Sequence, residues 1–365
     1  MGIAKHGRVG IVTLPGRFNY GNRLQNFAAS RIWESLGYEP ETLVLAERPN
    51  VIRLMKQNAK RVLGKVEPNP ESLMSPGRLA AFDRFNENIA TRHLDGLDSH
   101  LHQEYDLFSV GSDQVWNLDL ITYNDDWYFL KFAMPEQRIA FAPSVGLDSL
   151  NTLQAHRFAK GLRGFTKLSV RERRGAELIK ECTGMDAEVL CDPTLVLSAS
   201  DWRMVADERL TPNEPYIFSY LLGGVNQDAK IVLDCVTNHG DIPVLSLSDR
   251  EKPGEPPAGP AEFIDLVDHA LHVVTDSYHA AVFACMMNTP LTIIRRSGKG
   301  SGMFSRLETL GESFGIQNKI YGSTKFDQSR AAEFVGVEER ISCERAHFRS
   351  YFQSLLVLMD SKIIS

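Results

Sequence analysis

Residues 272–294 read HVVTDSYHAAVFACMMNTPLTII, and this stretch decides the fold. It opens with HVVT, an apolar run rich in β-branched residues, which predicts a buried strand. The polar loop DSYH follows, then the apolar run AAVFACMMN, then a second strand, PLTII. A strand, a helix and a second strand in this order predict a parallel βαβ unit.

The same alternation extends outward from this stretch in both directions. The strands YIFSYLL and PVLSL and the helices DAKIVLDCVTNHG and AEFIDLVDHA precede it, and RVGIVTL, LQNFAASRIWESLG and ETLVL open the chain. We therefore predict an α/β protein with two Rossmann-like domains that face a cleft. The domains are expected at residues 1–205 and 212–325, with a helical tail at 326–365 that packs back across their junction.

Composition excludes several classes of protein. The chain of 365 residues carries 40 Lys and Arg against 46 Asp and Glu, so it lacks the basic excess of a nucleic-acid-binding protein. Its five cysteines form no CxxC pair, and neither a disulfide framework, a zinc site nor any other metal site is predicted. No apolar run is long enough to span a membrane. We expect a cytoplasmic protein, for which peripheral membrane association stays open.

The loop Thr275-Asp276-Ser277-Tyr278-His279 is the strongest candidate for a functional site. It places a hydroxyl, a carboxylate and an imidazole where a buried helix begins, and the backbone N–H groups there favour an anion. Histidine also transfers protons near neutral pH. The structural alternative is a helix cap with the histidine packed in the core.

Two cation-bearing segments accompany this loop. Residues 295–302, RRSGKGSG, follow the strand PLTII and could close on a phosphate through Lys299, although they match no Walker A order. Arg171 stands in SVRE at the end of another strand, where it could hold a carboxylate or a phosphate. The alternatives are a solvated loop and a surface ion pair. Asp192, in Asp-Pro-Thr, is expected to have a structural role in a turn.

Two polar motifs in the first half of the chain suit a sugar. Asp113, Trp116 and Asn117 lie in GSDQVWN after a buried strand, and an indole beside an acid and amides can hold a sugar ring. Asn22 lies in NYGNRLQ, which follows the first strand. The alternatives are a capped turn with the tryptophan in the core and an ordinary turn between a strand and a helix.

Taken in order, these segments resemble the polysaccharide pyruvyl transferase family. The resemblance rests on NYGNRLQNFA, YDLFSVGSDQVWN, LSVRERRGAELI, CDPTLVLSASDW and VVTDSYHAAVFACMMNTPL followed by MFSRLETLG, and runs over most of the chain. It implies a fold similar to the GT-B glycosyltransferases. It also implies that phosphoenolpyruvate is the donor, with no separate cofactor, and that a glycan or lipid-linked sugar is the acceptor. The product would be a pyruvate ketal on two hydroxyls, with phosphate released.

The resemblance and the residue chemistry together suggest roles on the donor side, which is the second domain. Phosphoenolpyruvate carries a carboxylate and a phosphate, so Arg171, Lys299, His279 and Ser277 are expected to bind it. His279 is the candidate acid that protonates the donor methylene carbon, or the group that holds the departing phosphate.

The acceptor side is assigned to the first domain. Asp113 is the candidate base or acceptor-orienting group, and Asn22, Trp116 and Asn117 are expected to hold the sugar. Two other functions stay open. One is a GT-B glycosyltransferase that uses a nucleotide sugar, with Glu262 on the ribose. The other is a glycan-binding relative with weak catalysis.

Overall fold

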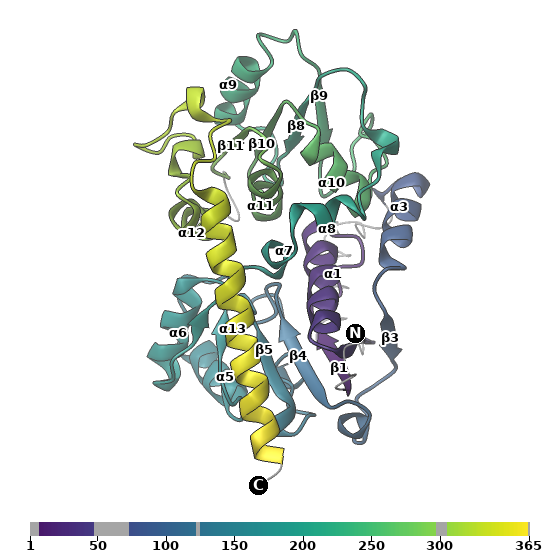
Figure 1. The fold of residues 1–365 in the computed structure, drawn as a ribbon, viewed down its shortest axis with the longest axis vertical. Helices are drawn as coiled ribbons and strands as arrows, with labels where there is room; N and C mark the ends of the chain where they lie inside the picture. Colours follow the sequence, from purple (N-terminus) through teal and green to yellow (C-terminus); the bar gives the residue numbers. More distant parts are fainter. Residues whose placement is uncertain (1–6, 47–72, 122–124, 297–304, 364–365) are drawn as a thin grey trace, which may run out of the picture.

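The computed structural model describes residues 7–46, 73–121, 125–296 and 305–363 (Figure 1). The first half contains, in chain order, β1 (Gly7–Val12), α1 (Tyr20–Ser35), β2 (Tyr38–Leu45), α3 (Pro76–Asn86), β3 (Thr91–Leu94), β4 (Leu107–Gly111), α4 (Asp125–Tyr128), β5 (Arg138–Phe141), α5 (Thr152–Leu162), β6 (Ser169–Val170), α6 (Arg173–Thr183) and β7 (Glu188–Val189). The second half contains α7 (Pro193–Val196), α8 (Ala199–Arg203), β8 (Ile217–Tyr220), α9 (Gln227–Val236), β9 (Val244–Leu247), α10 (Pro260–Asp268), β10 (His272–Thr275), α11 (Tyr278–Met287), β11 (Leu291–Ile293), α12 (Ser305–Phe314) and α13 (Val337–Ile363).

Two parallel sheets organise the described residues. One sheet has the strand order β3-β2-β1-β4-β5, and the other has the order β11-β10-β8-β9. Every strand pair in them is parallel, with helices in the connections. The predicted α/β architecture with two Rossmann-like units is therefore confirmed. Residues 206–211, which separate the two predicted domains, lie between α8 and β8.

Helix α1 begins earlier than its apolar spacing predicts. The spacing starts at Leu24, but the helix starts at Tyr20 because the Asn19 side chain accepts a hydrogen bond from the Asn22 backbone N–H at 2.9 Å. The cap brings Gly21 and Asn22 into the first helical turn. This extra turn faces the second unit, where Gly21 contacts the side chain of His279.

The two units share one hydrophobic core cluster. Tyr20, Phe27 and Phe82 of the first unit pack with Phe263 and Phe283 of the second, all nearly or fully buried. The Tyr20 hydroxyl donates a 2.6 Å hydrogen bond to the carbonyl of Ala258 across the junction. Continuous apolar packing of this kind fixes the relative placement of the two units.

A buried cation also joins the units. The Arg78 side chain on α3 is fully buried, and its Nη1 donates to the Ser248 carbonyl at 2.9 Å. Its Nη2 lies 3.1 Å from Glu255, and its Nε lies 3.6 Å from Glu251. Because both carboxylates come from the segment after β9, this network ties α3 to the second unit.

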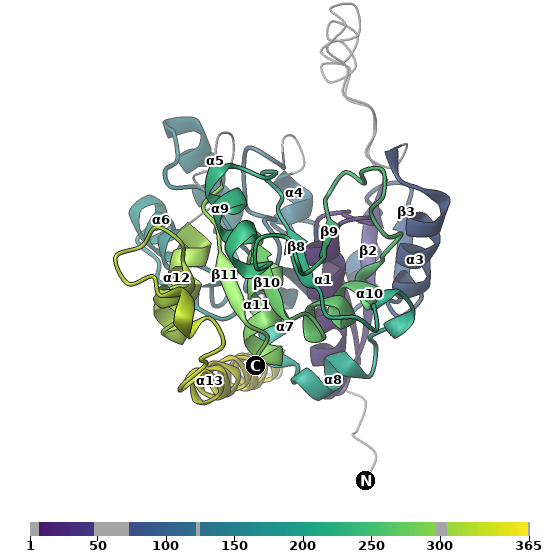
Figure 2. The ribbon, with the colours of Figure 1, turned by 90° about the horizontal axis from the view of Figure 1, so that it is seen from above.

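The C-terminal tail becomes a continuous helix at Val337 and contacts both units. Val337 and Ile341 belong to the cluster shared by the two units. Phe348 and Phe352, further along α13, pack with Trp33 and other residues beside the first sheet. Figures 1 and 2 show this helix running along one flank of the molecule. In the described part of the chain, no helix combines the length and apolarity needed to cross a membrane.

Candidate functional site

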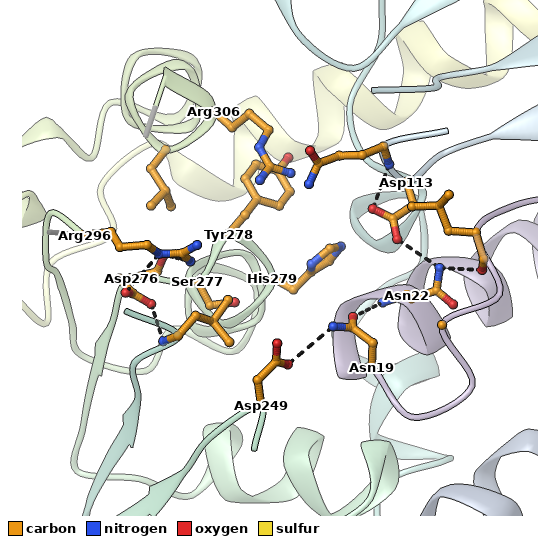
Figure 3. A pocket seen from close by; sticks show the side chains of 15 residues that line it. Asn19, Asn22, Asp113, Asp249, Asp276, Ser277, Tyr278, His279, Arg296 and Arg306 are labelled. Atoms are coloured by element: carbon orange, nitrogen blue, oxygen red, sulfur yellow. Dashed lines mark hydrogen bonds and ion pairs between the residues drawn. The ribbon is translucent and has the colours of Figure 1, made fainter. Parts of the chain in front are cut away.

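A cavity of about 400 Å³ lies where the carboxyl ends of the two sheets face each other (Figure 3). Leu14 and Asp113 reach it from the first unit, just after β1 and β4. Leu222, Asp249 and Asp276 reach it just after β8, β9 and β10. Open parallel sheets bind ligands at this edge. The cavity also has the size of an ordinary small-molecule site.

His279 projects into this cavity from the first turn of α11 (Figure 3). Its side chain is 12% exposed, and its Nε2 lies 3.6 Å from the Oδ2 of Asp192. Gly21 of α1 packs against the ring, because a Cβ at residue 21 would stand only 2.2 Å from Nδ1. The absent side chain at Gly21 therefore makes room for the imidazole between the two units.

Asp192 is more than a residue of a turn. Its Oδ1 accepts hydrogen bonds from the Thr194 N–H at 2.9 Å and the Thr194 hydroxyl at 2.7 Å. Its Oδ2 forms an ion pair with Arg171 Nη1 and faces His279. Burial opposes ionisation of this carboxyl, but the Arg171 charge and the imidazole outweigh it, so the pKa of Asp192 falls well below its ordinary value. Asp192 is therefore a buried anion beneath the candidate acid.

Arg171 lies behind the cavity rather than among the residues that line it. Its side chain is buried, and its guanidinium carbon is 5.1 Å from the centre of the Tyr278 ring. It lines a smaller cavity of about 250 Å³ on the other side of Tyr278. Its Nε and Nη2 have no hydrogen-bond partner among the described residues. A donor-binding role for Arg171 stays a prediction. In the structure, the Arg171 side chain forms an ion pair with Asp192.

Two other arginines supply positive charge to the cavity wall. The Nε of Arg296 lies 3.2 Å from Asp276, which also accepts the N–H groups of Leu222 and Gly223, at 2.7 Å each. Arg306 of α12 lies 6.0 Å from the centre of the Tyr278 ring. Burial, together with the nearby charge of Arg171, lowers the pKa of Arg306 to about 10. Asp276 is thus a structural anchor for Arg296.

Ser277 precedes α11 as its N-cap residue and lines the cavity. In the structure as described, its side chain makes no capping hydrogen bond, so the hydroxyl is not used by the helix. The first backbone N–H groups of α11 also lack partners within the helix and suit an anion. Ser277 and His279, both predicted on the donor side, therefore line one cavity.

The opposite wall carries amides and carboxylates (Figure 3). The Asn22 Nδ2 donates to Asp113 Oδ2 at 2.9 Å and to the Leu14 carbonyl at 3.0 Å. Asn19 reaches Asp249 across the junction at 3.4 Å. Although Asp249 is exposed as a residue, its carboxyl faces the cavity, and desolvation there raises its pKa. This wall can accept and donate hydrogen bonds to hydroxyl groups.

Two predicted acceptor residues do not lie on this wall. Trp116 is fully buried, and its indole N–H donates to the Tyr128 carbonyl at 3.1 Å while the ring stacks on Phe129. Asn117 is 5% exposed, and its Nδ2 donates to Gln114 at 2.9 Å. Trp116 therefore fills the core, and Asn117 braces the loop that carries Asp113. The prediction that these side chains hold a sugar does not fit this placement. Lys299 lies outside the described residues.

Four residues of the site were not predicted from the sequence to belong to it: Arg296, Arg306, Asp249 and Asp192. Arg296 is the second residue of the cationic segment 295–302 that also contains Lys299, and it comes three residues after β11. Asp249 stands at a strand end, a position that could have singled it out. Arg306 lies on a different helix, and only tertiary packing brings it to the cavity.

The fold and the cavity define a two-unit α/β protein with a polar site between its units. The family model for polysaccharide pyruvyl transferase matches residues 19–298, more than half of the chain. The chain therefore belongs to the polysaccharide pyruvyl transferase family. No curated protein matches it in sequence.

Solved structures resemble the chain at low identity. A putative UDP-N-acetylglucosamine 2-epimerase from Listeria monocytogenes has a TM-score of 0.45 and 10% identity, with 93% of this chain and 90% of that chain covered. The wall teichoic acid polymerase TagF has a TM-score of 0.47 and 11% identity, covering 99% and 90%. UDP-GlcNAc 2-epimerase from Neisseria meningitidis has a TM-score of 0.42 and 8% identity, covering 92% and 99%.

Proposed function

We propose that the protein transfers the pyruvyl group of phosphoenolpyruvate onto two hydroxyls of a glycan sugar. The product is a pyruvate ketal, and phosphate is released. The observation that carries this proposal is the two-sided cavity of a family member. Arg296, Arg306 and His279 come from the second unit, and Asp113 and Asn22 come from the first. The part of the wall that carries Arg296, Arg306 and His279 suits an anionic donor, with Asp276 offsetting part of the charge of Arg296. The part that carries Asp113 and Asn22 suits a polyhydroxyl acceptor.

The donor would lie against α11 and the two arginines. Its phosphate and carboxylate need directional N–H donors, which guanidinium groups and a helix N-terminus supply. The Ser277 hydroxyl adds a further donor on this side. Arg171 and Lys299 stay predicted donor ligands, Arg171 from the neighbouring cavity and Lys299 from the segment after Arg296.

The chemistry needs one acid and one base. A proton from His279 adds to the methylene carbon of phosphoenolpyruvate, and the electron pair of the double bond forms the new C–H bond. An acceptor hydroxyl attacks the resulting cationic carbon and loses its proton to Asp113. The bond between this carbon and the bridging phosphate oxygen then breaks, with its electron pair leaving on the phosphate. The second hydroxyl attacks the same carbon to close the ketal, and its proton passes to the departing phosphate. Asn22 orients Asp113 through their 2.9 Å hydrogen bond.

Adjacent arginines offer a matched test of the donor side. Arg296 lines the cavity, whereas Arg295 is half exposed, pairs with Glu308 at 2.8 Å and lies outside the lining. Calorimetric binding of phosphoenolpyruvate should weaken about 10- to 100-fold in Arg296→Ala, as expected for a lost charge-assisted hydrogen bond. Arg295→Ala should stay within about threefold of wild type. Equal effects in the two variants would contradict a donor site at Arg296.

In the nucleotide-sugar alternative, Glu262 is the residue expected to contact the ribose. Glu262 is buried on α10, where Oε1 pairs with Arg84 at 2.8 Å and Oε2 accepts the Gly259 N–H at 2.9 Å. It acts as a helix cap at the junction and is not among the residues that line the cavity. Titration with UDP and UDP-sugars separates this alternative from the proposal. Phosphate release from phosphoenolpyruvate would exclude a protein that only binds glycans.

A further inference from the structure

The imidazole of His279 has a buried acidic neighbour that the reaction described above leaves without a role. His279 Nε2 is buried and has no hydrogen-bond partner among the described residues. The nearest anion is Asp192, whose Oδ2 lies 3.6 Å away. Hydrogen bonds around catalytic groups are often this long before substrate binds. The two residues come from different units, since Asp192 precedes α7 and His279 lies in the first turn of α11.

Asp192 cannot move away easily or accept a proton easily. Its Oδ1 is held by the N–H and hydroxyl of Thr194, and its Oδ2 is paired with Arg171. Both members of the Asp192–Arg171 pair are almost fully buried. An ionised carboxylate only accepts hydrogen bonds. A favourable contact with the imidazole therefore requires a proton on the nitrogen that faces it.

We propose that Asp192 is the positioning residue of His279, fixing the ring with Nε2–H toward Asp192 and leaving Nδ1 to face the substrate. This inference rests on the proposed function for its catalytic meaning. Arg171 acts one step further back, because it keeps Asp192 in place as an anion. Arg171, which follows β6, and Asp192, the N-cap residue of α7, are thus aligned behind His279 in the first turn of α11.

The surroundings of Nδ1 are consistent with a role for this nitrogen toward the substrate, with Nε2 held by Asp192. Gly21 packs against Nδ1 and contributes no side chain there, whereas Nε2 is the ring nitrogen that is buried without a hydrogen-bond partner among the described residues. The Tyr278 ring lies 5.4 Å away between ring centres, and the other ionisable residues that line the same cavity are Asp113, Asp249, Asp276, Arg296 and Arg306. In the proposed reaction the proton leaves Nδ1 for the methylene carbon. The Nε2–H bond is kept, so the ring ends as the neutral tautomer that Asp192 favours.

The tautomer of His279 can be measured in the free full-length protein. Nitrogen-15 NMR of histidine-labelled protein, at a pH where the imidazole is neutral, distinguishes a protonated Nε2 from a protonated Nδ1. The His279→Gln variant assigns the signal among the 10 histidines. We expect the proton on Nε2 in wild type and a shift toward the Nδ1–H form in Asp192→Asn, whose amide can donate. A wild-type proton on Nδ1 would overturn the proposal even if the variant does not fold.

Kinetics give a second and separate readout. Asp192→Asn should lower kcat for phosphate release at least about 100-fold. The KM for phosphoenolpyruvate should change much less than kcat, because Arg296, Arg306 and Ser277 keep their places in the cavity. Asp201→Asn is the matched control, since Asp201 also caps a short helix nearby but accepts from Ser198. An unchanged kcat in Asp192→Asn would overturn the positioning role alone. An Nε2–H tautomer in a wild-type protein that never releases phosphate would support the positioning and reject the proposed function.

Discussion

The contact between Gly21 and His279 predicts a loss of activity without a loss of stability. A Cβ at residue 21 would stand 2.2 Å from Nδ1 and 2.6 Å from Cε1 of His279. Ordinary carbon contacts need roughly 3.5 Å, so in Gly21→Ala the imidazole has to move by about 1 Å or more. A displacement of this size at a reacting group costs about 100-fold in rate.

The backbone itself tolerates alanine at this position. Gly21 lies within the first turn of α1, and alanine is favoured over glycine in helices by about 1 kcal/mol. We therefore expect Gly21→Ala to unfold at or near the wild-type temperature while phosphate release falls about 100-fold. The assay is phosphate release from phosphoenolpyruvate with a panel of methyl hexopyranosides as acceptors.

Gly175→Ala is the matched control for this variant. Gly175 also lies in the first turn of a helix, α6, and a Cβ there would meet a milder contact, 3.1 Å from a methyl group of Val145. The variant should keep activity close to that of wild type. If Gly21→Ala is as active as Gly175→Ala, His279 is not held where the reaction needs it, and the reasoning about the site is refuted.

The remaining predictions concern catalysis, the junction and the response to pH. His279→Ala should lose at least about 100-fold in turnover while staying folded, as circular dichroism would verify, and near-normal turnover would remove His279 from the mechanism. Arg78→Ala should lower the free energy of unfolding in urea by about 3–5 kcal/mol, because it leaves two carboxylates buried without their cation. Arg17→Ala breaks only an exposed pair and should cost less than about 1 kcal/mol, so equal losses would contradict the account of the junction. Burial lowers the pKa of Lys319 to about 8, whereas the same side chain in the unfolded chain has a pKa of about 10.4. Between these two pH values the unfolded state binds more protons than the folded state. The free energy of unfolding should therefore rise with pH across this window. Lys319→Met should flatten this rise relative to the exposed control Lys230→Met, and a wild type that loses stability over the same window would show the sign to be wrong.

Local patterns in the sequence predict most of the fold. The strand HVVT coincides with β10 at His272–Thr275, and the alternation of strands and helices yields the two parallel sheets. The start of α1 differs from its prediction because a capping side chain, Asn19, extends the helix beyond its apolar spacing. Such caps depend on one hydrogen bond and leave no periodic trace.

The site is only partly predictable. His279, Ser277, Asp113 and Asn22 can be selected because each follows a strand that ends at the cleft. Trp116 differs from its prediction because an indole suits a sugar and a core equally well, and only its packing against Phe129 distinguishes the two.

Two further residues of the site, Asp192 and Arg306, cannot be identified from sequence motifs. The motif around Asp192 indicates only a turn, because its partners, Arg171 and His279, are distant in sequence. Arg306 belongs to no motif with His279, yet both line one cavity. Pairings of this kind arise from the docking of the two units, which no single segment encodes.

The most direct test of the central claim is a product analysis with wild-type protein. The protein is incubated with phosphoenolpyruvate and the methyl hexopyranoside panel, released phosphate is quantified, and the sugars are examined by mass spectrometry. We predict phosphate in equal amount to a sugar that has gained one pyruvate ketal, and neither product with His279→Ala. Transfer of sugar from a UDP-sugar, with no consumption of phosphoenolpyruvate, would contradict the account.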